Sequence, residues 1–175
     1  IHYRNTSNNP GTSNRTVTYT VTDASGGTSN DARVISVTAA NDAPTISIDA
    51  STLAYTENDA ATQIDAAATS SDADGDADWN TGTLVVQMTG NNEAADELSI
   101  LDNVVGSINT DGTNLQDGAT VIGTLSSSEG TVTDGTALTI TLNSNATNAL
   151  VQEVVRAIHY RNTSNNPGTS NRTVT

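Results

Sequence analysis

The chain lacks cysteine, phenylalanine and lysine, and only five of its 175 residues are aromatic. Without cysteine it can form neither a disulfide nor a thiolate zinc site. No apolar run approaches the roughly 18 residues of a membrane-spanning helix, so we expect no membrane insertion by this segment. Leucine, isoleucine and valine together supply 33 residues, close to the level of disordered chains. We therefore expect a thin core that needs stabilisation besides burial.

Positive charge is also scarce. The chain has twenty acidic residues and only six arginines, which gives a net charge of −14. This balance excludes a nucleic-acid partner, because phosphate binding needs a basic surface. No nucleophile or acid/base pair gathers in the sequence, so we expect no enzyme. The two histidines, His2 and His159, occupy one repeated position and fit a structural role better than a catalytic one.

An exact repeat dominates what is present. Residues 1–18 and residues 158–175 both read IHYRNTSNNPGTSNRTVT, at an offset of 157 residues. The chain is therefore expected to be a window on a tandem array of near-identical units. Each unit carries 20 acids against four arginines, a net charge of −16 that repels its neighbours. Adjacent identical repeats of the same polypeptide are the expected partners.

A linker separates two parts of this window. Ala40-Asn41-Asp42-Ala43-Pro44 is small, polar and proline-terminated, and it lies between two alternating runs. We expect residues 1–43 to be the last strands of one repeat. Residues 44–175 are expected to be most of the next repeat, without the counterpart of residues 19–43.

The strand signals predict an all-β fold. Apolar and polar residues alternate at 15–22, 33–38, 45–49, 82–89, 119–125 and 137–142, and more weakly at 62–68. Glycine-containing turns separate these runs, a pattern typical of a β-sandwich. One segment, residues 148–158, has helical spacing of apolar residues and predicts a short helix with Asn148 as its N-cap.

The strongest chemical signal is an acidic loop. Asp72, Asp74, Asp76 and Asp78 alternate with small residues around Gly75. Calcium takes six to eight oxygen ligands, and such a loop can direct several of them to one point. The alternative is a solvated acidic loop, in which four close carboxylates repel one another. Asp111-Gly112 and Asp117-Gly118 fit either a second ion loop or tight turns.

Other acidic positions are weaker candidates. They are Asn41 and Asp42 in the linker, Glu57 and Asp59 after the 45–49 run, and Asp23 with Asp31 before the 33–38 run. Taken singly, each is more typical of a turn or a surface than of a metal ligand.

The Asn-Asp-Ala-Pro linker, the segment Tyr-Thr-Glu-Asn-Asp at 55–59, and the helix followed by residues 158–167 resemble bacterial cadherin-like, Ig-like repeats. Such repeats are extender domains of long repeats-in-toxin adhesins. The resemblance implies an Ig-like sandwich in tandem array, calcium as cofactor, and an extracellular place on a bacterial surface. It further implies a role in adhesion and biofilm formation.

The resemblance also implies a ligand set. Animal cadherins bind calcium between domains through a glutamate after the first strand, an Asx-rich linker and an Asp-x-Asp loop. Glu57 resembles the first, Asn41-Asp42 the second and Asp72-Ala73-Asp74 the third, while Asp23 resembles a ligand before the final strand. The linker and the acidic loop are expected at one end of the unit and Glu57 at the other.

Two rivals remain at this stage. A glycan- or ligand-binding adhesive module needs an exposed aromatic platform, and the single tryptophan, Trp79, fits a core plug better. An enzyme needs a convergent catalytic set, which is not visible.

The expected boundary near residue 43 does not coincide with the start of the repeated eighteen residues, and this offset predicts one more property. Residues 1–43 are expected to complete the second unit of a neighbouring molecule, giving head-to-tail contact between chains.

Overall fold

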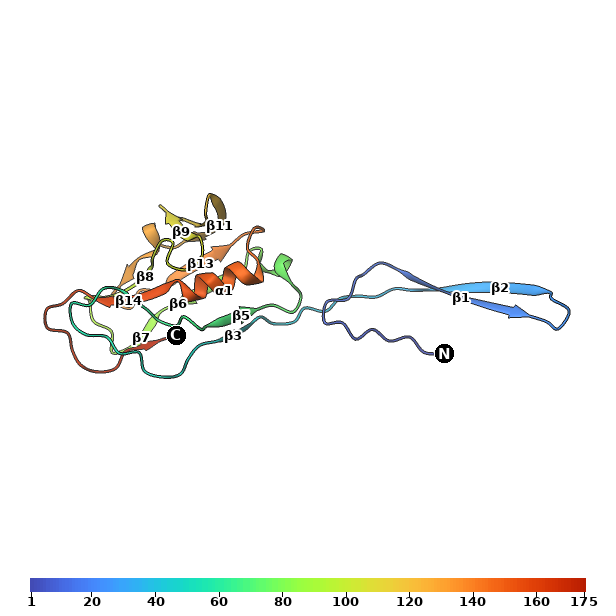
Figure 1. Cartoon of the computed structure of the whole chain (residues 1–175), viewed down its shortest axis with the longest axis horizontal. Helices are drawn as coiled ribbons and strands as arrows, with labels where there is room; N and C mark the ends of the chain where they lie inside the picture. Colours follow the sequence, from blue (N-terminus) through green and yellow to red (C-terminus); the bar gives the residue numbers. More distant parts are fainter. The chain divides into compact units, whose positions relative to one another are not determined.

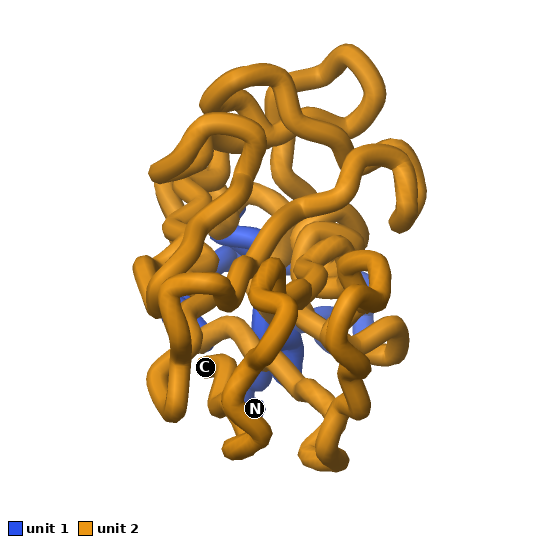
Figure 2. Tube along the Cα trace, turned by 90° about the vertical axis from the view of Figure 1, so that its left-hand side faces the viewer, with its two compact units in different colours: residues 1–42 blue, residues 43–175 orange.

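The computed structural model describes all 175 residues, and they form two compact units, Ile1–Asp42 and Ala43–Thr175 (Figure 2). Strands dominate both, and the only α-helix has nine residues. The predicted all-β class is therefore confirmed.

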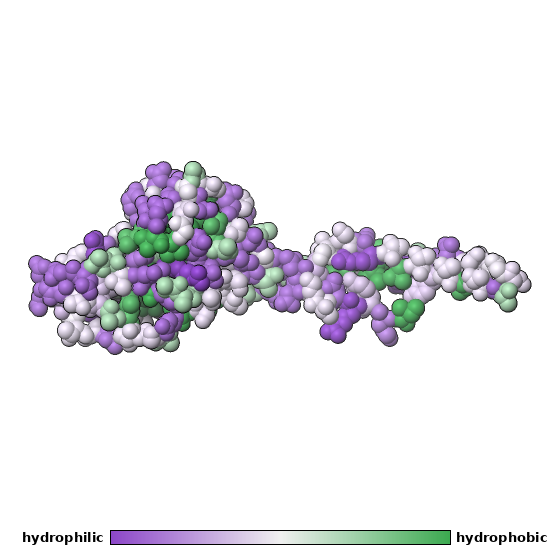
Figure 3. All heavy atoms as spheres, viewed as in Figure 1, coloured by the Kyte–Doolittle hydropathy of each residue, from purple (hydrophilic) through white to green (hydrophobic).

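Unit 1 is an antiparallel hairpin of β1 (Arg15–Thr22) and β2 (Thr28–Ile35) (Figure 1). The alternation of threonine with valine and tyrosine predicts β1 over the observed bounds. The second strand begins earlier than the predicted 33–38, because β2 pairs with β1 residue for residue from Thr28 onward. The hairpin has no core of its own, and Tyr19 and Val21 are 48% and 69% exposed. Hydrophobic side chains lie open along it in Figure 3.

Unit 2 contains thirteen further strands, two 3-10 turns and the helix α1 (Asn148–Arg156). Its strands are β3 (Thr45–Ser47), β4 (Thr62–Gln63), β5 (Thr69–Ser71), β6 (Thr83–Val86), β7 (Met88–Gly90), β8 (Asp96–Ile100), β9 (Ile108–Asp111), β10 (Asn114–Asp117), β11 (Thr120–Leu125), β12 (Val132–Thr133), β13 (Leu138–Leu142), β14 (Ile158–Asn162) and β15 (Thr173–Val174). The 3-10 turns are η1 (Asp76–Trp79) and η2 (Ser128–Gly130).

Two sheets supply most of the core of unit 2. One has the order β6-β13-β11-β10-β9 and the other β12-β8-β14-β4. Two small ladders, β15-β7 and β3-β5, complete the strand pairing. The core residues come from both main sheets and from α1, and the fully buried large ones are Leu98, Ile108, Leu115, Ile122, Leu138, Ile140 and Val154. With so few aromatics, aliphatic side chains do nearly all of this packing.

The helix α1 presents one apolar face to this core. Val151 and Val154 are buried, at a spacing that places both on the same side of the helix. The predicted N-cap was one residue too late. Thr147 is the N-cap, because its side chain accepts the Leu150 N–H at 3.2 Å. Asn148 is the first helical residue, and its amide is engaged elsewhere.

Pairing of β3 with β5 fixes where the chain enters unit 2. Thr45 is opposite Ser71, and the Thr45 hydroxyl lies 3.2 Å from the Ser71 carbonyl oxygen. The first strand of unit 2 therefore begins beside the end of β5. Asp72 directly follows β5 in the sequence. The segment after β3, which contains Glu57, lies at the other end of the unit (Figure 1).

The repeated eighteen residues adopt two structures. In unit 2, Ile158 and His159 are each 3% exposed in β14, which is hydrogen-bonded to both β8 and β4. In unit 1, the same sequence begins with Ile1 at 97% exposure and forms no strand before Arg15. The local turns are the same in both copies: Asn5 Oδ1 accepts the Ser7 N–H and Asn162 Oδ1 the Ser164 N–H, each at 2.8 Å.

Candidate metal centre

The acidic loop connects β5 to η1 at the end of unit 2 where the chain enters. Its sharp turn is made at Gly75, with φ 94° and ψ −168°, a conformation that only glycine adopts readily. Asp72, which precedes this turn, is buried, with 8% of its surface exposed. Asp78, within η1, is exposed. The turn reverses the chain, so that carboxylates on its two sides face each other.

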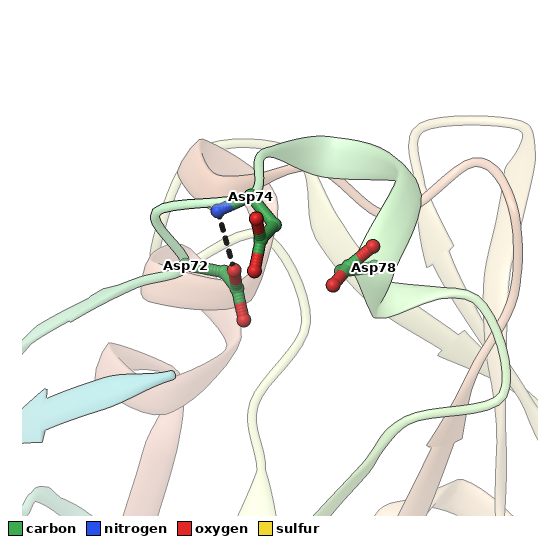
Figure 4. Close-up of side chains that lie close together, drawn as sticks. All are labelled: Asp72, Asp74 and Asp78. Carbon is green, nitrogen blue, oxygen red and sulfur yellow. Dashed lines mark hydrogen bonds between the residues drawn. The ribbon is translucent and has the colours of Figure 1, made fainter. Parts of the chain in front are cut away.

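Three of the four predicted loop aspartates converge. Carboxylate oxygens of Asp72, Asp74 and Asp78 all lie within 4.8 Å of one another. One Asp72 oxygen also accepts the Asp74 N–H at 2.8 Å, which holds these two residues in a fixed relation. Figure 4 shows Asp78 on the 3-10 turn, facing the other two carboxylates. No other group of three acidic or histidine side chains in the molecule comes this close.

The fourth aspartate serves the helix. Asp76 Oδ1 accepts the Asn148 N–H at 2.7 Å, in the first turn of α1. A carboxylate there satisfies a free N–H and complements the positive end of the helix dipole. Asp76 was expected among the metal ligands with its three neighbours, but the structure directs it to the helix instead.

The side chain of Asn148 clamps the same loop. Its Oδ1 accepts the N–H of Asp72 at 2.6 Å and the indole N–H of Trp79 at 3.0 Å, and its Nδ2 donates to the Asp72 carbonyl at 3.0 Å. Trp79 is 8% exposed and belongs to the hydrophobic core, as the sequence predicted. Loop, helix and core are thus joined through one amide.

The donor set fits a hard cation. Oxygens bound to one calcium ion at about 2.3–2.6 Å are at most about 5 Å apart, and the three carboxylates meet that limit. All three donors are carboxylates, which suit calcium, magnesium or manganese rather than softer metals. Three carboxylates alone supply fewer oxygens than calcium takes, so further ligands are needed from outside this group.

The structure places the other predicted ligands in local turns. Asp23 Oδ1 accepts the Ser25 and Gly27 N–H groups, each at 2.9 Å, and so closes the β1–β2 hairpin. Asp31 Oδ1 accepts the Ala32 N–H at 2.8 Å. In the linker, Asn41 Nδ2 donates to the Asp42 carbonyl at 2.9 Å. These residues belong to unit 1.

Glu57 and Asp59 form a turn between β3 and β4. Asp59 Oδ2 accepts the Thr56 N–H at 3.1 Å, and Glu57 Oε1 accepts from the Asn58 side chain at 3.3 Å. The Tyr55 hydroxyl donates to the Asp59 carbonyl at 2.8 Å and lies 3.2 Å from the Asn162 carbonyl, which ties this turn to the end of β14. The structure does not bring Glu57 or Asp59 to the Asp72 cluster.

The two Asp-Gly pairs are hairpin turns. Asp111 and Asn114 pair across a turn containing Gly112, and Asp117 and Thr120 pair across one containing Gly118. Both glycines have positive φ, 61° and 57°. Of the two interpretations of these pairs, the structure shows the tight turns.

Sequence reasoning missed a buried polar centre at Asp96. This side chain is 0% exposed and accepts from Tyr160 at 2.6 Å, Asn162 at 2.6 Å and the Glu93 N–H at 2.7 Å. Arg172 adds an ion pair at 3.1 Å. Three of these partners come from the repeated segment 158–175, far from Asp96 in sequence, so nothing local marks the residue.

The surroundings of Asp96 shift three pKa values. Burial opposes the charge of Asp96, but the hydrogen bonds from Tyr160, Asn162, Glu93 and Arg172 outweigh it and lower its pKa. Burial together with the bond to Asp96 raises the pKa of Tyr160 to about 12. Burial opposes the charge of Arg172 too, yet Asp96 raises its pKa. The centre is a buried network of hydrogen bonds and ion pairs, which Arg172 extends to Glu93 at 3.0 Å.

A shallow cleft of about 810 Å³ lies between residues 48–57 and 166–174 of unit 2. Tyr55 and Tyr160 lie along it, with ring centroids 5.0 Å apart and planes at 81°. Both hydroxyls are engaged in hydrogen bonds within the protein.

Comparisons with known proteins found no relative: no protein-family model, no curated protein and no solved structure matches this chain. None of its helices is both long and apolar enough to cross a membrane.

Proposed function

We propose that this chain is a calcium-stabilised structural extender repeat of a large bacterial cell-surface adhesin, built as an Ig-like, cadherin-like β-sandwich in tandem array. The array projects a distal binding region from the cell for adhesion and biofilm formation. The observation that carries the proposal is the convergence of Asp72, Asp74 and Asp78 at the end of unit 2 where the linker enters.

The position of this cluster supports a role at the junction between repeats. Asp42 precedes Thr45 by three residues, so the chain spans at most about 11 Å between their Cα atoms. We propose Asn41 and Asp42, which stand just before this unit in the sequence, as the source of the ligands that three carboxylates lack. Calcium held this way neutralises part of the −16 charge of each repeat and stiffens the linker.

The remaining predicted ligands have a different place in the proposal. Glu57 and Asp59 belong to the turn that Tyr55 ties to the end of β14, and we propose that this turn faces the linker that follows the repeat. Asp23 and Asp31 belong to the hairpin that ends a repeat. We propose them as ligands of the other half of each junction, supplied by the neighbouring repeats of the array.

Calorimetric titration of the full chain with calcium tests the proposal. Wild type is expected to bind calcium, and Asp72→Asn and Asp74→Asn are each expected to weaken binding at least tenfold, because each removes a charged ligand. Asp134→Asn is the matched control. Asp134 is exposed and outside the cluster, and asparagine tolerates its positive φ of 54°. Equal loss in all three variants, or no binding by wild type, contradicts the proposal.

The cleft beside Tyr55 and Tyr160 favours one alternative, a glycan- or ligand-binding adhesive module. It is a hollow lined by two tyrosines and by polar side chains, and small ligands bind in concave sites. Because both hydroxyls are already hydrogen-bonded and the two rings pack edge to face, few groups in the cleft are free to contact a sugar. A glycan array probed with the full chain separates the two functions, since an extender binds none of the sugars.

A further inference from the structure

We propose that the uncharged outer face of strands β6, β13 and β11 binds the same face of a second copy of this chain, side by side. The contact joins neighbouring arrays laterally, so the repeat itself binds other repeats of its kind. This inference takes from the proposed function only the repetition of the unit, and it does not depend on calcium. It rests on strand register, on the absence of charge from three adjacent strands and on free threonine hydroxyls.

The face is built on a cross-strand row of threonines. The strands β6, β13 and β11 are neighbours in the five-stranded sheet (Figure 1). Thr83 of β6 is opposite Thr141 of β13, which is in turn opposite Thr124 of β11. Side chains of directly opposite residues lie on the same side of a sheet, so the three threonines form one row. A second row, Val85 and Thr139, runs beside it two residues along the strands.

Both rows are turned away from the core. Ile140 and Leu142 of β13 are 0% and 3% exposed, whereas Thr141 between them is exposed. Val85 of β6 is 48% exposed. Because β13 and β11 are interior strands of their sheet, the position of this face does not depend on what lies beside the edges of the sheet.

No charged residue occurs in these three strands. The row of threonines continues from Thr124 through Asn114 of β10 and reaches a charge only at Asp111 of β9. At the usual strand spacing, Asp111 is about 10 Å from Thr124. The twenty acids of the chain therefore lie on other surfaces, and this face is neutral in a molecule of net charge −14.

Threonine makes this face complementary to itself. A hydroxyl both donates and accepts a hydrogen bond, whereas a face of carboxylates repels its own copy. The hydroxyls of Thr83, Thr124 and Thr141 form no hydrogen bond within the chain. The threonine methyl groups and the side chain of Val85 add apolar contact. Two copies can therefore exchange hydroxyl hydrogen bonds across a two-fold axis, which is the symmetry of a surface that binds itself.

Charge selects a second copy as the partner. A basic partner is attracted to the acidic loops rather than to a neutral face. A strongly acidic partner can approach closely only where neither surface presents carboxylates, because charges within the screening length of about 8 Å repel one another. A second copy meets this condition, since it has the same net charge of −14 and the same neutral face.

The size of the face makes a single contact weak. With strands about 4.8 Å apart and about 6.8 Å between alternate residues, the five side chains of the two rows cover roughly 160 Å². A stable interface buries about 800 Å² on each side. One pair of faces is therefore expected to hold only transiently, and lasting adhesion needs many faces acting together, as in an array or on a densely coated surface.

Clustering of microbeads that carry the full chain at high density tests the proposal. Wild-type beads are expected to cluster at physiological salt, both in calcium and in chelator, while the free chain stays monomeric in sedimentation velocity. Thr124→Glu with Thr141→Glu sets two charges in the middle of the face and is expected to abolish clustering. Asn165→Glu with Thr169→Glu is the matched control, because both positions are exposed and lie outside the three strands. It is expected to cluster as wild type does.

Mixing beads with complementary faces is the decisive step. Thr124→Arg with Thr141→Arg carries the opposite charge at the same two positions. Mixed with beads of the glutamate variant of the face, it is expected to restore clusters that contain both kinds of bead. Asn165→Arg with Thr169→Arg, mixed in the same way, is expected to leave the beads dispersed, because its charges lie off the face.

Each variant is first checked for the melting transition of unit 2. If Thr124→Glu with Thr141→Glu loses it, Thr83→Glu with Thr139→Glu charges the same face. Dispersed wild-type beads, clustering of the charged-face variant, or an equal loss in the glutamate control would each overturn the proposal, as would a complementary mixture that stays dispersed. Clusters that vanish in chelator while unit 2 stays folded would assign the contact to calcium bridges. Wild-type beads that cluster only with an added polysaccharide would assign the face to a glycan, and both results would overturn the proposal.

Discussion

The side chain of Asn148 exchanges two hydrogen bonds with the backbone of Asp72: Oδ1 accepts the N–H at 2.6 Å, and Nδ2 donates to the carbonyl at 3.0 Å. The pair joins the first residue of α1 to the first residue of the acidic loop. Because the same Oδ1 also accepts from Trp79, the loop is fixed to the helix and the core together. The backbone of Asp72, at the start of the acidic loop, is therefore held in place by the fold.

Replacing Asn148 by alanine is expected to lower the free energy of unfolding by about 2 kcal/mol, since partly buried donors on Asp72 and Trp79 lose their partner. Urea unfolding measures this. Asn165→Ala is the control, because Asn165 is exposed, and its change is expected to stay within about 0.5 kcal/mol. Equal values for the two variants would show that the clamp contributes nothing to stability.

Asp96 makes stability depend on acid pH. Its pKa in the folded chain is lowered from 3.8, so its stabilising contribution is complete above that value and is lost as the pH falls through the folded pKa. Asp96→Asn is expected to cost about 3 kcal/mol at pH 7, because it removes the buried carboxylate that accepts from Tyr160 and Asn162 and leaves Arg172 paired with Glu93 alone. It should also flatten the fall in unfolding free energy between about pH 5 and pH 2. An unchanged acid slope in the variant contradicts this account.

Tyr160 acts at the opposite end of the pH scale. Its folded pKa is raised from 10.0 to about 12. Its contribution to stability is therefore complete below pH 10 and is lost as the pH rises from there through the folded pKa. Phenolate absorbance measures the titration, and Tyr160→Phe is expected to remove a component near pH 12. If the component that Tyr160→Phe removes titrates near pH 10 instead, the hydroxyl of Tyr160 is not shielded as the structure shows.

The two copies of the repeated segment should differ in hydrogen exchange. Amides of 158–162 lie in β14 between two strands, whereas residues 1–5 form no strand. Peptides that include residues 150–157 identify the second copy by mass spectrometry. Its amides are expected to exchange far more slowly than those of residues 1–5. Equal protection of both copies would mean that the first copy has found a partner sheet of its own.

The sequence was informative where structure is local. Alternation of apolar and polar residues predicts β1, β11 and β13 closely, and apolar spacing predicts α1, although its cap is Thr147 rather than Asn148. The acidic loop was found from its spacing around Gly75. The diversion of Asp76 to the helix was not foreseeable, because its partner Asn148 is 72 residues away.

Long-range pairing explains what was missed. The strand β8 begins with Asp96 and Glu97, and nothing in the sequence around Asp96 indicates that Tyr160, Asn162 and Arg172 converge on it. The repeated segment gives a direct example, because the same sequence forms a buried strand at 158–162 and no strand at 1–5. Neighbours, rather than propensity, decide the structure of that segment.

The central claim is that calcium stabilises and stiffens the array. A thermal melt with small-angle scattering on an in-phase tandem of two complete repeats, first in millimolar calcium and then in chelator, tests it most directly. Calcium at about 100 times its dissociation constant adds about 2.7 kcal/mol, so chelation is expected to lower the Tm by about 5–10 °C and to change the scattering profile as the linker loses its stiffness. An unchanged Tm and an unchanged scattering profile would contradict the account and leave the acidic loop as solvated surface.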